Sequence, residues 1–126
     1  MSRPPWRILV ADDDPTAVLL FRAALAGADF QIEVAGDGDD ALAMFRQTAF
    51  DAALLDVEMP GLDGCEVCAA IRQSHGPAFP VFLITGRGDD AFLHRVRSLA
   101  ARHVAKPVDW ATLPGMLREA LGGLPG

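Results

Sequence analysis

Residues 7–14 read RILVADDD, a short apolar run that ends in three consecutive aspartates. A run so short and so rich in branched residues predicts a buried strand over Arg7–Ala11. Pro15 follows at a position where the first turn of a helix tolerates proline, and an apolar stripe predicts a helix over Thr16–Ala26 that ends at Gly27. The stretch therefore predicts a strand, an acidic turn and a helix in succession.

This order of a strand followed by a helix recurs four more times along the chain. Further strands are predicted over Gln31–Ala35, Ala52–Leu55, Pro80–Ile84 and His103–Ala105. The other helices are predicted to run from Asp37 or Asp39 to Gln47, over Cys65–Gln73, from Asp89 or Asp90 to about Leu99, and onward from an Asp109 cap. The second strand is the more polar one and is expected at an edge. Repeated strand–helix units predict an α/β fold, a five-stranded, doubly wound (βα)5 parallel sheet with helices on both faces.

Length and composition exclude several classes of protein. The chain has 126 residues, 51% of them hydrophobic, which suits one domain with a substantial core. We expect a single domain over residues 1–126, with a core from about 7 to 121 and short tails at 1–6 and 122–126. The net charge of −6 argues against binding to nucleic acid or to an anionic membrane. Two cysteines, no secretion signal and no apolar run of the ~20 residues that cross a bilayer favour a cytoplasmic location.

Polar residues follow four of the five predicted strands. In a doubly wound sheet the functional site lies outside the carboxyl ends of the strands. The residues expected at this edge are Asp12, Asp13 and Asp14 after the first strand, Asp56 and Glu58 after the third, Thr85 after the fourth and Lys106 after the fifth. Carboxylates gathered in one place repel one another, and Mg²⁺ relieves that repulsion because it prefers oxygen ligands. Beside the metal, Asp56 suits a nucleophile toward a phosphoryl group, whose oxygens Lys106 and Thr85 would bind.

Four motifs stand at the ends of these strands. They are Ile8–Pro15 (ILVADDDP), Leu54–Gly64 (LLDVEMPGLDG), Leu83–Gly86 (LITG) and Ala105–Pro107 (AKP). In this order they resemble the receiver domain of two-component response regulators, over nearly the whole chain from about Arg7 to Leu121. The resemblance implies a flavodoxin-like strand order of 2-1-3-4-5 and a cis peptide bond before Pro107. It also implies a signalling switch, not an enzyme, which catalyses only its own phosphorylation and dephosphorylation.

The resemblance further implies roles for individual residues. Asp56 would accept the phosphoryl group, with Thr85 and Lys106 assisting. The implied Mg²⁺ ligands are Asp13 directly, Asp12 through water, Asp56, and Glu58 through its backbone carbonyl. The donor would be a phosphohistidine on a histidine kinase or a histidine phosphotransfer protein, and the output a changed affinity for an unidentified downstream protein. A homodimer through the last helix–strand–helix face is also predicted as one arrangement of such a chain.

His103 departs from the family pattern. The position three residues before the family's lysine usually holds Tyr or Phe, and this aromatic moves inward when the threonine moves toward the phosphoryl group. His103 is therefore predicted as a switch residue, and because histidine titrates near pH 6.5, partner affinity is expected to depend on pH through it. Glu58 and Arg87 occupy positions at which the family tunes the lifetime of the phosphoryl group.

A second function fits part of the pattern. Asp12-x-Asp14-x-Thr16 after an apolar strand resembles the nucleophile motif of haloacid-dehalogenase-type phosphatases, with Asp12 as nucleophile and Asp14 as general acid. Against it, 126 residues leave no cap domain to close over a substrate, and Asp56 has no role. An interaction module with an inactive site is disfavoured because every acceptor element is present. Since no output domain follows the last predicted helix, we expect a stand-alone receiver or one cut from a longer protein.

Cys65 and Cys68 form a Cys-x-x-Cys at a predicted helix start, where a thiolate would be stabilised. No second cysteine pair accompanies them, so a zinc or redox site is disfavoured. Packing of both side chains on one side of the helix is the expectation.

Overall fold

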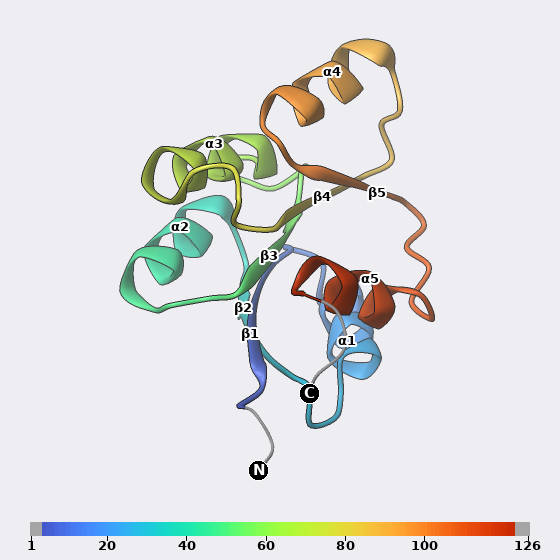
Figure 1. Cartoon of the computed structure of the whole chain (residues 1–126). Coiled ribbons are helices and arrows are strands. Elements are labelled where there is room, and N and C mark those ends of the chain that lie inside the picture. The colour runs from blue at the N-terminus through green and yellow to red at the C-terminus, as the bar shows by residue number, and fades with distance from the viewer. Residues whose placement is uncertain (1–3, 123–126) are drawn as a thin grey trace.

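The strands form a parallel sheet in the predicted order. The computed structural model describes residues 4–122, and its strands are β1 (Trp6–Ala11), β2 (Phe30–Ala35), β3 (Ala52–Asp56), β4 (Val81–Thr85) and β5 (Arg102–Ala105). Neighbouring strands pair in parallel in the order β2-β1-β3-β4-β5 (Figure 1). The predicted α/β class, the strand order and the edge position of the second strand are confirmed.

Aspartates fix the starts of four helices. The helices are α1 (Pro15–Ala24), α2 (Gly38–Gln47), α3 (Gly64–His75), α4 (Asp90–Ser98) and α5 (Leu113–Ala120). The side chain of the residue before each of the first four accepts a hydrogen bond from an amide of the first turn; these residues are Asp14, Asp37, Asp63 and Asp89. Such caps satisfy amides that have no partner within the helix, so short polar residues set where each helix begins.

The helices lie on both faces of the sheet, α2, α3 and α4 on one and α1 and α5 on the other (Figure 1). Residues of the central strands alternate between the two cores, as strand geometry requires. Leu9, Leu55 and Leu83 belong to the core under α2, α3 and α4, whereas Ile8, Leu54 and Phe82 belong to the core under α1 and α5. β3 and β4 are buried along their whole length, and the side chains at their carboxyl ends are therefore held in fixed positions.

The last helix begins later than the sequence predicts. An Asp109 cap is expected, but α5 starts at Leu113, and Thr112 precedes it without a side-chain cap. The Asp109 carboxylate instead accepts from the Ala111 amide at 3.2 Å, and its carbonyl accepts from the Thr112 amide at 3.2 Å. Asp109 thus caps a separate turn, because an aspartate satisfies a turn and a helix start by the same hydrogen bond.

The predicted and observed bounds of other helices and strands differ by a few residues. α1 ends at Ala24 rather than Ala26. β1 begins at Trp6, which the sequence places in a tail; the remaining tail predictions for 1–3 and 123–126 lie outside the described residues. The Lys106–Pro107 peptide bond is cis, as predicted. Between residues 4 and 122, no helix is both long enough and apolar enough to cross a membrane.

Gly64 allows α3 to begin directly against the end of β3. A Cβ at this position would lie 2.6 Å from the Asp56 carbonyl oxygen and 3.0 Å from the Val57 Cα. The Gly64 amide also donates to the Val57 carbonyl at 3.1 Å. This close approach of two backbones holds the loop after Asp56 in place.

We predict that Gly64→Ala lowers the free energy of unfolding by about 2 kcal/mol, because the added methyl group overpacks two backbones that cannot move apart freely. Urea denaturation measures the change. The matched control is Gly115→Ala within α5, where a Cβ meets nothing within 4 Å. That substitution should stabilise by up to about 1 kcal/mol, since alanine is the better helix former. Equal effects of the two substitutions would contradict the packing argument.

Candidate functional site

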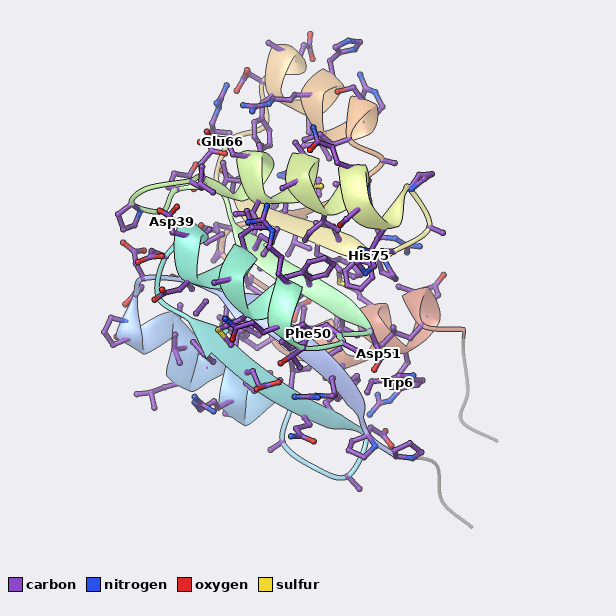
Figure 2. All side chains as sticks on the ribbon, turned by 90° about the vertical axis from the view of Figure 1, so that its left-hand side faces the viewer. Trp6, Asp39, Phe50, Asp51, Glu66 and His75 are labelled. Carbon is purple, nitrogen blue, oxygen red and sulfur yellow. The ribbon has the colours of Figure 1, made fainter. Side chains whose placement is uncertain are left out.

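The predicted site residues gather at the carboxyl edge of the sheet. The strands end there at Ala11, Asp56, Thr85 and Ala105, and the first turns of the helices lie at the same end of the molecule. Figure 2 shows this polarity: Asp39 and Glu66, in the first turns of α2 and α3, lie at one end, and Trp6 and His75 lie toward the other. The parallel topology thus concentrates the acidic residues that follow β1 and β3.

Three carboxylates form the centre of the site. Oxygens of Asp12, Asp13 and Asp56 all lie within 4.8 Å of one another. Asp12 and Asp56 are almost completely buried, whereas Asp13 is exposed. Asp14 lines the same cavity but lies outside this cluster, and its carboxylate caps α1 by accepting from the Thr16 amide at 3.0 Å. The Asp14 amide donates to Asp12 Oδ1 at 2.9 Å, which fixes the orientation of the Asp12 side chain.

Burial makes this cluster electrostatically unfavourable when it is ionised. Desolvation raises the pKa of Asp12 above 3.8, against the lowering effects of the Asp14 amide and of Lys106. Desolvation also raises the pKa of Asp56, and Lys106 again opposes the change. The neighbouring carboxylates add repulsion in both cases. A bound cation would remove both penalties.

Lys106 provides the positive charge of the site. Its Nζ lies 2.9 Å from Asp56 Oδ1 and 3.9 Å from Glu58 Oε2. The contact with Asp56 is a close ion pair with a buried carboxylate oxygen. Burial lowers the pKa of Lys106, but the carboxylates of Asp56, Glu58 and Asp12 outweigh it and raise the pKa overall. Lys106 is therefore a permanent ammonium that faces Asp56.

Thr85 is linked to Glu58. Its hydroxyl donates to Glu58 Oε1 at 2.7 Å and accepts from the Arg87 amide at 3.1 Å. Thr85 is fully buried, while the Glu58 side chain is 53% exposed. The family resemblance places Glu58 at a position that tunes the lifetime of the phosphoryl group, but the sequence does not predict that its side chain binds Thr85. The two residues are far apart in the chain, and only the rotamers at the ends of β3 and β4 bring them together.

A cavity of about 420 Å³ opens over the carboxylates. Asp12, Asp13, Asp56, Glu58 and Lys106 line its polar side, and Leu20, Phe21 and Trp110 line an apolar side. The rings of Phe21 and Trp110 pack edge to face, with their centroids 4.8 Å apart. The sequence does not predict this apolar wall, although leucine on the outer side of the first helix is a signal for it.

His103 does not lie among these residues. Its imidazole packs edge to face against Phe92 of α4, with the ring centroids 6.0 Å apart. The register of β4 and β5 pairs Leu83 with His103 and Thr85 with Ala105, so His103 is a diagonal neighbour of Thr85 on the same face of the sheet. Nε2 of His103 is buried and has no hydrogen-bond partner. The ring therefore points inward, an orientation that the sequence leaves open.

The donor set at the cavity suits Mg²⁺. Three carboxylates that converge within 4.8 Å offer hard oxygen ligands, and two of them, Asp12 and Asp56, are buried. Asp13 is exposed, so water can reach this side of the cluster and provide the water ligands that Mg²⁺ retains. The residues present thus fit the metal predicted from the sequence.

Cys65 and Cys68 lie away from this chemistry, inside the core under α3. Both thiols are free and completely buried, and burial raises the pKa of Cys68 to about 11. The pKa of Cys65 is also raised by burial, so desolvation outweighs the helix start that would favour a thiolate. The packing interpretation of this pair agrees with the structure.

Comparisons with known proteins agree with this geometry. Residues 8–118 match the family model of the response regulator receiver domain. The chain is 41% identical to response regulator MprA of Mycobacterium sp. (strain KMS) over 120 residues, which cover 93% of this chain and 51% of that protein. It is 36% identical to the DNA-binding response regulator MtrA of Mycolicibacterium smegmatis over 117 residues, 91% of this chain and 50% of that one. The chain spans about half the length of these curated relatives.

Solved structures give the same result. The chemotaxis response regulator CheY4 of Vibrio cholerae superposes with a TM-score of 0.83 at 28% identity, over 93% of this chain and 99% of that one. A response regulator from Chloroflexus aurantiacus superposes with a TM-score of 0.84 at 28% identity, over 93% and 98% of the two chains.

We predict that Mg²⁺ affinity depends on Asp13 and not on Asp14. Asp13→Asn should weaken binding more than about tenfold, because it removes a charged ligand. Asp14→Asn is the matched control: asparagine is an equally good helix cap, and Asp14 is not one of the three clustered carboxylates. Titration with Mg²⁺, followed by the fluorescence of Trp110 in the cavity wall, measures both affinities. Equal losses would contradict the ligand assignment.

We also predict that Asp12→Asn raises stability when divalent ions are absent. The pKa of Asp12 is higher in the folded than in the unfolded protein, so the stability from this group is complete below about pH 4 and is lost as the pH rises through the folded pKa. The variant should therefore have the higher urea midpoint at pH 7, and its advantage should disappear as the pH falls toward 4. A variant less stable than wild type at pH 7 would contradict this electrostatic account.

Proposed function

The chain belongs to the response regulator receiver domains, the phosphoacceptor switches of two-component signalling, and from this premise we propose that Asp56 is its phosphoacceptor. The observation that carries the proposal is the environment of Asp56. Its carboxylate is buried at the end of β3, 2.9 Å from the Lys106 ammonium, and it lines the cavity that the acidic cluster shares. A buried carboxylate beside one cation and an open cavity is suited to accept a group from outside.

The proposed reaction is transfer of a phosphoryl group from a phosphohistidine. A carboxylate oxygen of Asp56 attacks phosphorus, an O–P bond forms, and the P–N bond to the donor breaks. The departing imidazole nitrogen keeps the electron pair and takes a proton from solvent. Lys106 binds a phosphoryl oxygen through its ammonium, and Thr85 donates its hydroxyl to another, since such transfers depend mainly on positioning and charge neutralisation.

Mg²⁺ is the proposed cofactor. We assign Asp13 as a direct ligand, Asp12 as a ligand through water, and Asp56 and the backbone carbonyl of Glu58 as the remaining protein ligands. The convergence of the three aspartates and the presence of Glu58 in the cavity lining support this set. When bound, the ion would neutralise the charge of the phosphoryl oxygens and of the carboxylates. Asp12 and Asp56 are held in position for it by burial and by the Asp14 amide.

The proposed partners follow from the family. A histidine kinase or a histidine phosphotransfer protein would supply the phosphoryl group in the cytoplasm, and phosphorylation would change the affinity for a downstream protein. Autophosphatase activity is part of the same proposal. The homodimer through α4, β5 and α5 stays a prediction, as does the extent of the protein beyond this chain.

The alternative of a haloacid-dehalogenase-type phosphatase is not supported. The family model of the receiver domain extends over residues 8–118, and it includes Asp56, which the alternative leaves without a role. Asp14, the general acid of that alternative, caps α1 and lies outside the cluster of three aspartates. The chain is a regulatory domain, and the reaction proposed for it is its own phosphorylation.

We propose His103 as a second switch residue, which responds when Thr85 moves toward the phosphoryl group. Its inward ring, its place diagonal to Thr85 and its contact with Phe92 of α4 support this role. Its buried Nε2 has no hydrogen-bond partner in the present position, so the ring is not fixed there by a hydrogen bond through this atom. A displaced Thr85 would leave space into which the imidazole can turn.

We predict that Asp56→Asn abolishes phosphorylation and leaves the fold intact, because the amide keeps the shape and removes the nucleophile. Incubation with Mg²⁺ and acetyl phosphate, followed by intact mass measurement, should show a labile gain of one phosphoryl group in the wild type only. Asp40→Asn, an exposed change of the same kind on α2, is the control and should behave as wild type. Uptake by Asp56→Asn together with loss of uptake in Asp12→Asn would assign the nucleophile to Asp12.

We predict that the imidazole resonances of His103 move on phosphorylation. Proton–carbon NMR spectra of the histidine rings, recorded before and after addition of acetyl phosphate and Mg²⁺, measure the change. His75 is the internal reference, because it packs against Phe45 and Phe79 near the opposite end of the sheet. Substitution His103→Phe assigns the signal. A His103 signal as constant as that of His75 would exclude a switching role.

A further inference from the structure

We propose that the Glu58 side chain stabilises the unphosphorylated state by binding the Thr85 hydroxyl and attracting Lys106, the two groups that would otherwise bind the phosphoryl oxygens. This inference rests on the proposed function of Asp56. It concerns the carboxylate of Glu58, whereas the metal assignment concerns its backbone carbonyl.

The geometry places one carboxylate between the two phosphoryl-binding groups. Oε1 of Glu58 accepts the Thr85 hydroxyl at 2.7 Å, and Oε2 lies 3.9 Å from Lys106 Nζ. Thr85 is completely buried, so its hydroxyl needs an acceptor within the protein. Glu58 supplies that acceptor from the neighbouring strand end. Its side chain is therefore directed toward Thr85 and Lys106 and not into the cluster of three aspartates.

This contact would compete with a phosphoryl oxygen for the same two groups. A negatively charged oxygen that accepts from Thr85 and attracts Lys106 makes the same interactions as an oxygen of a phosphorylated Asp56. Both sets of interactions cannot form at once, because Thr85 has a single hydroxyl proton to donate. Phosphorylation must therefore displace Glu58 from Thr85, and the exchange is aided by repulsion between the Glu58 carboxylate and the phosphoryl group.

The release of Glu58 from Thr85 would change the structure at the start of α4. The Thr85 hydroxyl also accepts from the Arg87 amide, and the Arg87 side chain pairs with Asp89, the residue that caps α4. The Arg87 guanidinium lies 4.8 Å from the Phe92 ring centroid, and Phe92 contacts His103. A Thr85 hydroxyl that leaves Glu58 would therefore shift the loop before α4. Glu58 is thus a positioning residue that acts through Thr85.

The test compares three variants with the wild type. Glu58→Ala removes the acceptor and the charge, Glu58→Gln removes the charge and keeps an acceptor oxygen, and Glu119→Gln makes the same charge change on the exposed surface of α5 as a control. The first measurement is the rate of phosphoryl uptake against acetyl phosphate concentration with Mg²⁺. The second is the NMR shift of the Thr85 methyl group in the unphosphorylated proteins.

We expect Glu58→Ala to raise the maximal uptake rate about three- to tenfold, the range of one typical net hydrogen bond, because the exposed Glu58 carboxylate is partly screened by water. Glu58→Gln should raise it less, because the amide oxygen still accepts from Thr85. In unphosphorylated Glu58→Ala the Thr85 methyl shift should move toward its value in the phosphorylated wild type, and Glu119→Gln should match the wild type in both measurements.

Two outcomes would overturn the inference. Equal gains in Glu58→Ala and Glu58→Gln, seen as a lower half-saturating donor concentration and with no change at the Thr85 methyl, would show a general charge effect on an anionic donor. Wild-type rates and shifts in both variants would show that the contact has no influence. Failure of the proposed function itself has a different signature, since the wild type would then take up no phosphoryl group at all.

Discussion

Asp56 is a carboxylate at the end of a strand whose every residue is buried, and its charge needs a partner that only a distant part of the chain can provide. Lys106 supplies it, at 2.9 Å, from the end of β5. Because β4 lies between β3 and β5, the two residues meet only if the sheet has its observed order and all three strands end at the same level. The ion pair therefore depends on the fold, and the chemistry depends on the ion pair.

The remaining acidic residues are placed by local rules. Asp12 and Asp13 follow β1, next to β3, and the hydrogen bond by which Asp14 caps α1 keeps its carboxylate out of the cluster. The Gly64 contact holds the loop that carries Glu58 close to the end of β3. Caps, a glycine and strand register thus convert a linear pattern of acids into a cluster with one exposed member. The helix caps, the glycine and the strand register are not themselves reactive, yet each sets the position of a reactive group.

The sequence predicts the fold and the identity of the clustered residues because both depend on strand ends, which periodicity and composition reveal. It does not predict side-chain partners that depend on rotamers. Glu58 and Thr85 come from separate strand ends, and their hydrogen bond requires a particular side-chain direction. The inward orientation of His103 is unpredictable for the same reason. Asp109 was wrongly placed as the cap of α5, since turns and helix starts use the same residue types.

The ionised carboxylates of the site lower the stability of the folded protein. Burial raises the pKa values of Asp12 and Asp56, which means that folding disfavours their ionised forms at neutral pH. Neutral side chains of similar shape would avoid this penalty, but they would bind neither a cation nor a phosphoryl group. The repulsion among these charges destabilises the site when it holds no ligand. A ligand that offsets the repulsion, such as a metal ion, is therefore bound more tightly. In such a site the resting state needs its own interactions, and the contact of Glu58 with Thr85 and Lys106 supplies them.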